Sequence, residues 1–212
     1  MSSSKTLMLL RHAKSSWPEM TSDHERPLNG RGERDARRLG HLLRGLEHPE
    51  LIVGSNARRV RQTLDGLLSE ADYEGDVLLT PRLYLTSPRE YLAELARAAA
   101  CVAPSDTLSS AAGASSGVAT SPGARPASGV GMTGPSVSRA VPGAREASRV
   151  MLVGHNPTLE ELLAALTGAG LEPLPTGTLV VLSSTAQRWE QLAEARATRV
   201  AVYRARELPD AD

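Results

Sequence analysis

Hydrophobic positions along the chain follow two periods, and their alternation predicts the fold. Short apolar or alternating runs are typical of strands, and they occupy residues 6–10, 51–53, 77–79, 150–153, 179–182 and 199–205. Between these runs, apolar residues recur every three to four positions with charged residues on the opposite face, which predicts amphipathic helices. We expect these helices at residues 32–46, 57–68, 87–99 and 158–166.

Strands that alternate with helices predict an α/β fold. The expected architecture is a three-layer α/β/α sandwich, in which helices cover both faces of a mostly parallel central sheet. Sheets of this kind bind ligands beyond the carboxyl ends of their strands. The residues that directly follow the strands are therefore the first candidates for a functional site.

Residues 103–148 depart from both periods. Ala, Gly, Ser, Pro and Thr make up 35 of these 46 residues, and none is aromatic. Such a segment buries too little apolar surface to offset the entropy lost on ordering. We therefore expect a disordered, low-complexity insert at about 103–148 within a single domain that spans residues 1–212. The remaining 166 residues are enough for one hydrophobic core.

Composition excludes several classes of protein. Lys plus Arg and Asp plus Glu both number 24, so net charge favours neither a nucleic-acid nor a membrane partner. No apolar run approaches the ~18 residues that span a bilayer. The one cysteine, Cys101, has no partner for an internal disulfide, which favours a reducing, cytoplasmic location. No Cys/His spacing indicates a metal site, and we expect no cofactor.

Three of the expected strands end in residues suited to phosphate chemistry. Arg11-His12 follows the first strand, SNARRVRQT (residues 55–63) follows the second, and GHNP (residues 154–157) follows the fourth. A guanidinium is a planar fork that matches phosphate oxygens. A neutral imidazole can attack phosphorus and form a phosphohistidine that water then hydrolyses, and neighbouring arginines keep that imidazole neutral. A second histidine can donate to a phosphate oxygen in the transition state.

The same segments carry a family resemblance. LLRHAKSSW, SNARRVRQT and LVGHNP resemble, in this order, the signature elements of the histidine phosphatase (phosphoglycerate mutase-like) superfamily. DHERPLNGRG and LYLTSPREYL are similar to stretches of its SixA-type phosphohistidine phosphatases. The resemblance implies a phosphoglycerate mutase-like fold and a metal-independent phosphatase. It implies that His12 is the nucleophile, Arg11 and Arg59 the phosphate clamps, and His155 the second histidine.

The register of the second element decides between two neighbouring arginines. Arg59 stands four residues beyond Ser55 and occupies the family position, whereas a slip of one residue would bring Arg58 into the pocket instead. Further candidates for substrate binding lie next to the two histidines, and they are Lys14, Ser15 and Asn156. Ala13-Lys14 after the nucleophile favours the SixA type over the mutases.

The substrate is open at this stage. Asp23, Glu25 and Glu90 are candidates by position for a general acid, although each is also typical of a solvated charge. A phosphohistidine substrate has less need of such an acid, because protonated imidazole is a good leaving group. We therefore expect a phosphorylated protein as substrate. The alternatives are small phosphate esters such as a sugar phosphate or nucleotide, a phosphate-binding module without turnover, and, less favoured, a mutase.

Overall fold

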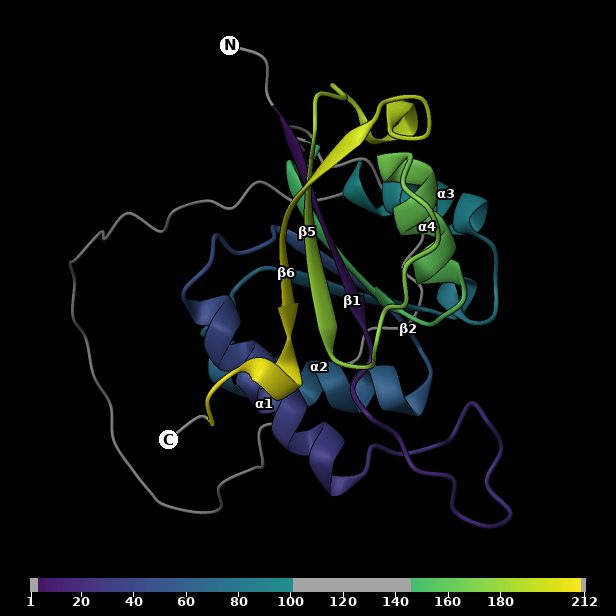
Figure 1. The fold of residues 1–212 in the computed structure, drawn as a ribbon, viewed down its shortest axis with the longest axis vertical. Coiled ribbons are helices and arrows are strands. Elements are labelled where there is room, and N and C mark those ends of the chain that lie inside the picture. The colour runs from purple at the N-terminus through teal and green to yellow at the C-terminus, as the bar shows by residue number, and fades with distance from the viewer. Residues whose placement is uncertain (1–3, 101–145, 211–212) are drawn as a thin grey trace, which may run out of the picture.

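The computed structural model describes residues 4–100 and 146–210 (Figure 1). Most of the expected insert, residues 103–145, lies outside the described residues. Its last residues are described and are packed. Ala147 is fully buried, and its carbonyl accepts hydrogen bonds from Lys5 Nζ (3.1 Å) and Trp189 Nε1 (2.7 Å). Residues 146–148, which the sequence places in the insert, therefore belong to the packed part of the chain.

A six-stranded sheet forms the centre of the fold. The strands are β1 (Lys5–Arg11), β2 (Leu51–Ser55), β3 (Asp76–Thr80), β4 (Arg149–Gly154), β5 (Thr178–Ser184) and β6 (Ala197–Arg204). They lie in the order β3-β2-β4-β1-β5-β6. The four strands from β3 to β1 are parallel, whereas β5 and β6 are added antiparallel. The predicted mostly parallel sheet is confirmed.

Helices cover both faces of this sheet. They are α1 (Gly30–Arg44), α2 (Arg58–Ala71), α3 (Pro88–Ala99) and α4 (Thr158–Thr167). In Figure 1, α1 and α2 lie together on one side of the sheet, and α3 and α4 lie on the other. The three-layer α/β/α sandwich predicted from the alternating periods is therefore confirmed.

Side chains of the central strand alternate between two hydrophobic cores. Leu7 and Leu9 of β1 pack with α3 and α4, while Met8 and Leu10 pack with α1 and α2. This follows from the two-residue period of a strand, which sends successive side chains to opposite faces. An apolar run without polar gaps is thus what a strand buried on both faces requires.

Capping and burial account for helix limits that differ from the expected ones. The Asn29 side chain accepts a hydrogen bond from Gly32 N, so α1 begins at Gly30 instead of residue 32. Helix α2 continues to Ala71, three residues beyond the expected end, and Ala71 is buried in the core. Ser87 caps α3 through Glu90 N, as its place before Pro88 predicts.

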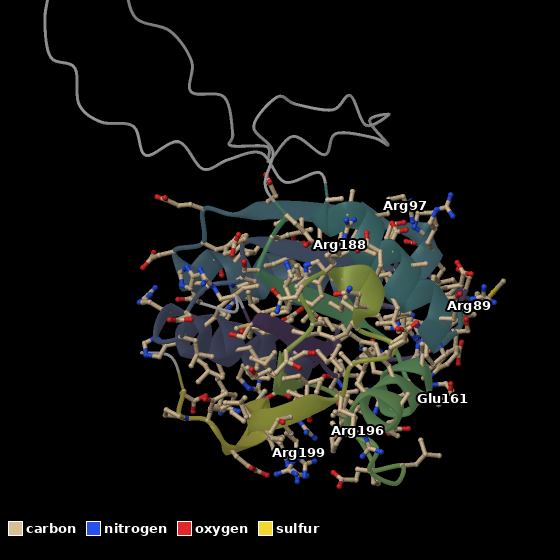
Figure 2. The ribbon with its side chains drawn as sticks, turned by 90° about the horizontal axis from the view of Figure 1, so that it is seen from above. Arg89, Arg97, Glu161, Arg188, Arg196 and Arg199 are labelled. Carbon is tan, nitrogen blue, oxygen red and sulfur yellow. The ribbon has the colours of Figure 1, made fainter. Side chains whose placement is uncertain are left out.

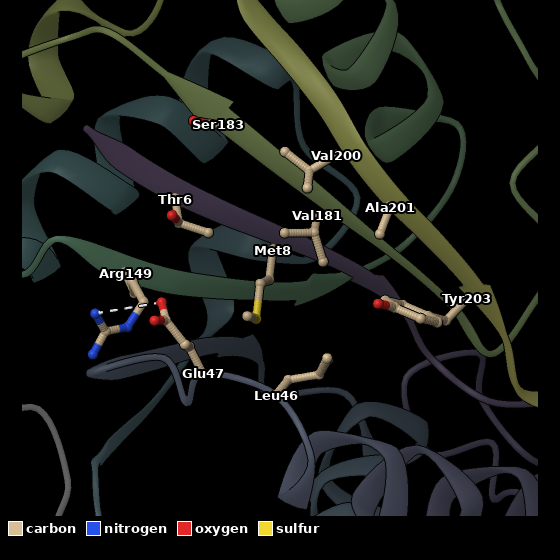
Figure 3. A pocket seen from close by; sticks show the side chains of 10 residues that line it. All are labelled: Thr6, Met8, Leu46, Glu47, Arg149, Val181, Ser183, Val200, Ala201 and Tyr203. Carbon is tan, nitrogen blue, oxygen red and sulfur yellow. Dashed lines mark ion pairs between the residues drawn. The ribbon is translucent and has the colours of Figure 1, made fainter.

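A groove on the sheet lies away from the carboxyl ends of the parallel strands. It has a volume of about 340 Å³ and is lined by side chains from β1, β4, β5, β6 and the segment after α1, among them Thr6, Met8, Arg149 and Tyr203 (Figure 3). Thr6 pairs with Arg149 at the amino ends of β1 and β4. The groove is therefore not the place where the candidate chemistry gathers. Within residues 4–100 and 146–210, no helix is both long and apolar enough to cross a membrane.

Candidate active site

The carboxyl ends of three neighbouring parallel strands bring the predicted residues together. Strand β1 leads into His12, β4 leads into His155, and β2 leads into α2, whose first turn carries Arg59. The rings of the two histidines lie 5.2 Å apart, centroid to centroid. Arg59 donates from Nε to His12 Nε2 (3.2 Å) and from Nη2 to His155 Nδ1 (3.1 Å). One guanidinium therefore bridges the two imidazoles.

Arg59 and Arg58 differ in their surroundings. The Arg59 side chain is 4% exposed, whereas Arg58 is exposed. Thr63 fixes this register, because its hydroxyl donates to Arg59 O (2.6 Å) and accepts from Ala13 N (3.0 Å). The loop after β1 is thereby tied to the first turn of α2. Arginines elsewhere, such as Arg89 and Arg199, project from the periphery of the described body (Figure 2).

Arg11 is held beside this cluster by a loop carbonyl. Its Nη1 donates to Leu174 O (2.7 Å), and its Nε is buried without a hydrogen-bond partner among the described residues. Burial and the nearby Arg59 lower the pKa of Arg11, although Glu160 opposes them. An arginine remains charged in such surroundings. Its unpaired N–H is thus available to an anion.

Hydrogen-bond partners define the tautomer of each histidine. His12 Nδ1 lies 2.8 Å from Ala13 O, and a carbonyl only accepts, so Nδ1 carries the proton and Nε2 keeps its lone pair. His155 Nδ1 accepts from Arg59, so a neutral His155 carries its proton on Nε2. That Nε2 is buried and has no partner among the described residues. One imidazole therefore offers a nucleophilic lone pair and the other offers a donor.

Burial keeps both imidazoles neutral. It lowers the pKa of His12 to about 3, with Arg59 and Arg11 acting in the same direction and the Ala13 carbonyl opposing them. Burial likewise lowers the pKa of His155 to about 3, and His12 and Arg59 contribute. A neutral His12 is the form that can attack phosphorus near pH 7.

Asp23 belongs to this cluster, and the interpretation of its carboxylate as a solvated charge was wrong. Arg59 donates to Asp23 O from Nη1 (2.6 Å) and to Asp23 Oδ2 from Nη2 (3.1 Å). Tyr84 donates its hydroxyl to the same Oδ2 (2.7 Å), and Arg26 donates to Oδ1 (2.9 Å). Partial burial raises the pKa of Asp23, but these donors outweigh it and hold the pKa at about 2. Asp23 is thus an ionised carboxylate near neutral pH and cannot act as a general acid.

The other two candidate acids lie in exposed positions. Glu25 is exposed and pairs with His24 (2.7 Å) and Arg61 (3.6 Å). Hydrogen bonding to His24 lowers the pKa of Glu25. Glu90 is exposed in the first turn of α3. The sequence pattern indicated no role for Arg26 or Tyr84, although the two SixA-like stretches contain them.

The remaining predicted pocket residues lie around the cluster. Ser15 is buried, and its hydroxyl accepts from Arg26 Nη2 (2.8 Å), whereas Lys14 is exposed. Asn156 donates from Nδ2 to Glu160 (2.5 Å) and to Leu174 O (3.0 Å), the carbonyl that also holds Arg11. Through these contacts, Ser15 and Asn156 hold neighbouring groups of the pocket in position.

Backbone contacts fix the segment that carries Arg11 and His12. Gly177 N, directly before β5, donates to the carbonyls of both residues (3.1 Å each), so the start of this strand lies against the site. Gly177 has φ 71°, a conformation that glycine adopts without strain. Among residues 4–100 and 146–210, no group of three or more His, Cys, Asp or Glu side chains is arranged to hold a metal ion.

Comparison with known proteins agrees with this geometry. The family model described as histidine phosphatase superfamily (branch 1) matches residues 7–84, which include His12, Arg59 and Tyr84. The structure of a protein assigned as the phosphohistidine phosphatase SixA of Nakamurella multipartitia is 28% identical, with a TM-score of 0.64. That similarity covers 94% of this chain and 95% of the other. Residues 7–84 of the chain thus match the histidine phosphatase superfamily, and the fold as a whole is similar to that of a SixA structure.

Other relatives match the chain in part or along its length. A chloroplastic protein of Arabidopsis thaliana is 41% identical over 85 residues, which is 38% of this chain and 39% of the relative. A Mycobacterium leprae protein is 28% identical over 92% of this chain and 98% of its own. The chain thus spans well under half the length of the Arabidopsis relative. A tungstate complex of the protein histidine phosphatase SixA, 16% identical with a TM-score of 0.62, shares the fold.

Proposed function

We propose that the chain is a phosphohydrolase that acts through a phosphohistidine on His12. The observation that carries this proposal is the Arg59 bridge between two neutral imidazoles, one with its lone pair and the other with its N–H available. A phosphoryl group needs a nucleophile, fixed cations and a donor at the same place. His12, Arg59 and His155 supply these three functions, and Arg11 adds a second cation with an unpaired N–H.

The proposed reaction has two steps. Phosphate oxygens bind the guanidinium groups of Arg11 and Arg59, and His12 Nε2 leaves its bond with Arg59 to attack phosphorus. The bond between phosphorus and the leaving group breaks, and His155 Nε2–H stabilises the charge on a phosphate oxygen. Water then hydrolyses the phosphohistidine and releases inorganic phosphate. The arginines meet the negative charge of the phosphate, so we propose that the reaction is independent of a metal ion.

We propose protein phosphohistidine as the substrate. Expulsion of an alkoxide is helped ~10²–10⁴-fold by a positioned acid, and the ionised Asp23 does not provide one. Protonated imidazole leaves without such help. The names of relatives support this choice, since three of the similar structures carry the name SixA. A neighbour of similar fold, a mycobacterial glucosyl-3-phosphoglycerate phosphatase at 16% identity, makes small phosphate esters the alternative to test.

Phosphate release from the two substrate classes tests this function. Wild type and His12→Ala are compared on a phosphohistidine-bearing protein and on a panel of alkyl phosphate esters, with and without a chelator. We expect turnover of phosphohistidine that the substitution abolishes and the chelator leaves unchanged. Preference for an ester would move the function to small-molecule hydrolysis. Full activity of His12→Ala would refute the assignment of the nucleophile, and no turnover by the wild type would favour a phosphate-binding module.

A further inference from the structure

We propose that Asp23 is a positioning residue that holds Arg59 in its orientation toward the two histidines throughout the reaction. This inference rests on the proposed function, because it assigns to Asp23 the alignment of the guanidinium that binds the phosphoryl group. The observation behind it is a two-point contact: Arg59 donates to both the carbonyl and the carboxylate of one residue.

The contacts of Arg59 divide into two sets. Its bonds to His12 Nε2 and His155 Nδ1 face the reacting centre, and the bond to His12 must break for that nitrogen to attack. Its bonds to Asp23 are made by Nη1 to the carbonyl and by Nη2, which also meets His155, to Oδ2, and they involve no reacting atom. The Asp23 contacts can therefore persist while a phosphate oxygen replaces His12 as a partner of Arg59. Because the bonds to Asp23 are kept, the guanidinium of Arg59 stays aligned while its other partners change.

Asp23 is itself fixed from two further segments of the chain. Tyr84, beyond β3, donates to Oδ2, and Arg26 donates to Oδ1. Arg26 is in turn held by Ser15 Oγ (2.8 Å) and Ser16 O (3.1 Å), and its guanidinium lies 3.5 Å from the centroid of the Trp17 ring. The carboxylate thus stands at the junction of three segments, each of which donates to it. Such support is what precise alignment of a reactive group requires.

The negative charge of Asp23 distinguishes a positioning role from a purely structural one. The carboxylate lies between Arg59 and Arg26, so its removal leaves two cations without their shared anion. Attraction for a phosphate anion should then stay constant or rise, whereas the alignment of Arg59 should deteriorate. Misplacement of a catalytic group by about 1 Å costs up to about 100-fold in rate. We expect kcat to fall while phosphate affinity is maintained.

Asp23→Asn is the decisive variant, because it keeps the size of the side chain and the backbone carbonyl. The full chain is assayed for kcat and KM on the phosphohistidine protein and for the inhibition constant of inorganic phosphate. We expect kcat to fall about 10- to 100-fold, with the inhibition constant unchanged or lower. Tyr84→Phe, which removes one support of the carboxylate, should lower kcat less. Glu25→Gln makes the same change of charge at an exposed position two residues away and should leave kcat unchanged.

Nuclear magnetic resonance of the arginine side chains provides a readout that does not depend on turnover. The Nε–H of Arg59 is buried and hydrogen-bonded, so we expect a resolved, exchange-protected signal in the wild type, identified by its absence in Arg59→Lys. This signal should broaden or shift in Asp23→Asn and persist in Glu25→Gln. An unchanged signal together with unchanged kcat in Asp23→Asn would overturn the proposal. So would a parallel loss of kcat, phosphate affinity and melting temperature, since that pattern marks a structural role. If the wild type turned over no substrate, the function would fail, while the signal would still decide the role of Asp23.

Discussion

The two buried histidines make the stability of the fold depend on pH. Each has a pKa of about 3 in the folded protein, compared with about 6.5 in an unfolded chain. Between these values, the unfolded chain binds one more proton per histidine than the folded protein. The free energy of unfolding therefore rises with pH through this window, and this stability is lost as pH falls below about 6.5.

The structure sets the size of this effect. His12 and His155 are 7% and 4% exposed, so solvent screens them little. Protonating one unfolded histidine with a pKa of about 6.5 stabilises the unfolded chain by roughly 1.4 kcal/mol at pH 5.5. For both residues we expect a loss of about 2–3 kcal/mol between pH 7.5 and 5.5. The ionised Asp23, with its lowered pKa, acts in a separate window below about pH 4.

Urea unfolding of the full chain between pH 5 and 8 measures this dependence. His12→Gln and His155→Gln should each remove about half of the slope, whereas His41→Gln, at an exposed position on α1, should leave it unchanged. A flat profile in the wild type, or an unchanged slope in both variants, would refute the conclusion that burial holds these imidazoles neutral. A slope of opposite sign would mean that they are protonated in the folded protein.

Three further predictions follow from the site. Arg59→Ala should lower kcat and phosphate affinity together by 10-fold or more, about 1.4 kcal/mol each, whereas the exposed Arg58 should tolerate alanine. The reverse result in steady-state kinetics would show that Arg58, not Arg59, faces the phosphate. A Cβ on Gly154 would clash with Tyr91 Oη, so Gly154→Ala should cost about 1–3 kcal/mol of stability, and less when combined with Tyr91→Phe. Additive costs in urea unfolding would contradict this. Because His12 is neutral, kcat/KM corrected for substrate ionisation should show no inflection near pH 6.5, and such an inflection, lost in His155→Gln, would assign a titrating role to His155.

Convergence of the main candidate residues was predictable because it depends on the carboxyl ends of parallel strands. Arg11 ends β1, and His12 and His155 directly follow β1 and β4, which pair in parallel. Strand β2 delivers Arg59 from the neighbouring position. Strand and helix periods are local properties of the sequence, so they predict this part of the fold well. The antiparallel addition of β5 and β6 depends on how the chain turns after α4, which the periods do not encode.

Asp23 and Tyr84 were harder to predict because their positions depend on contacts between distant segments. The loop after His12 folds back on itself through Asn29 N to Lys14 O (3.0 Å) and Ser16 N to Pro27 O (3.0 Å). Only this fold brings Asp23, which follows no strand, to the guanidinium of Arg59. A sequence pattern that treats each charged residue separately assigns such a carboxylate to solvent.

Burial of polar groups at the site destabilises the fold, and this explains why so many contacts hold these groups in place. Two imidazoles and one guanidinium are buried, and Arg11 Nε and His155 Nε2 lack partners among the described residues. A buried polar group without a hydrogen bond destabilises a protein by about 1–3 kcal/mol. Apolar residues here would give a more stable fold, but they could bind no anion. The contacts of Arg59 with Asp23, of Arg11 with Leu174 and of Gly177 with the His12 segment hold the unpaired donors in place, so that an arriving phosphate gains bonds that the protein has already oriented.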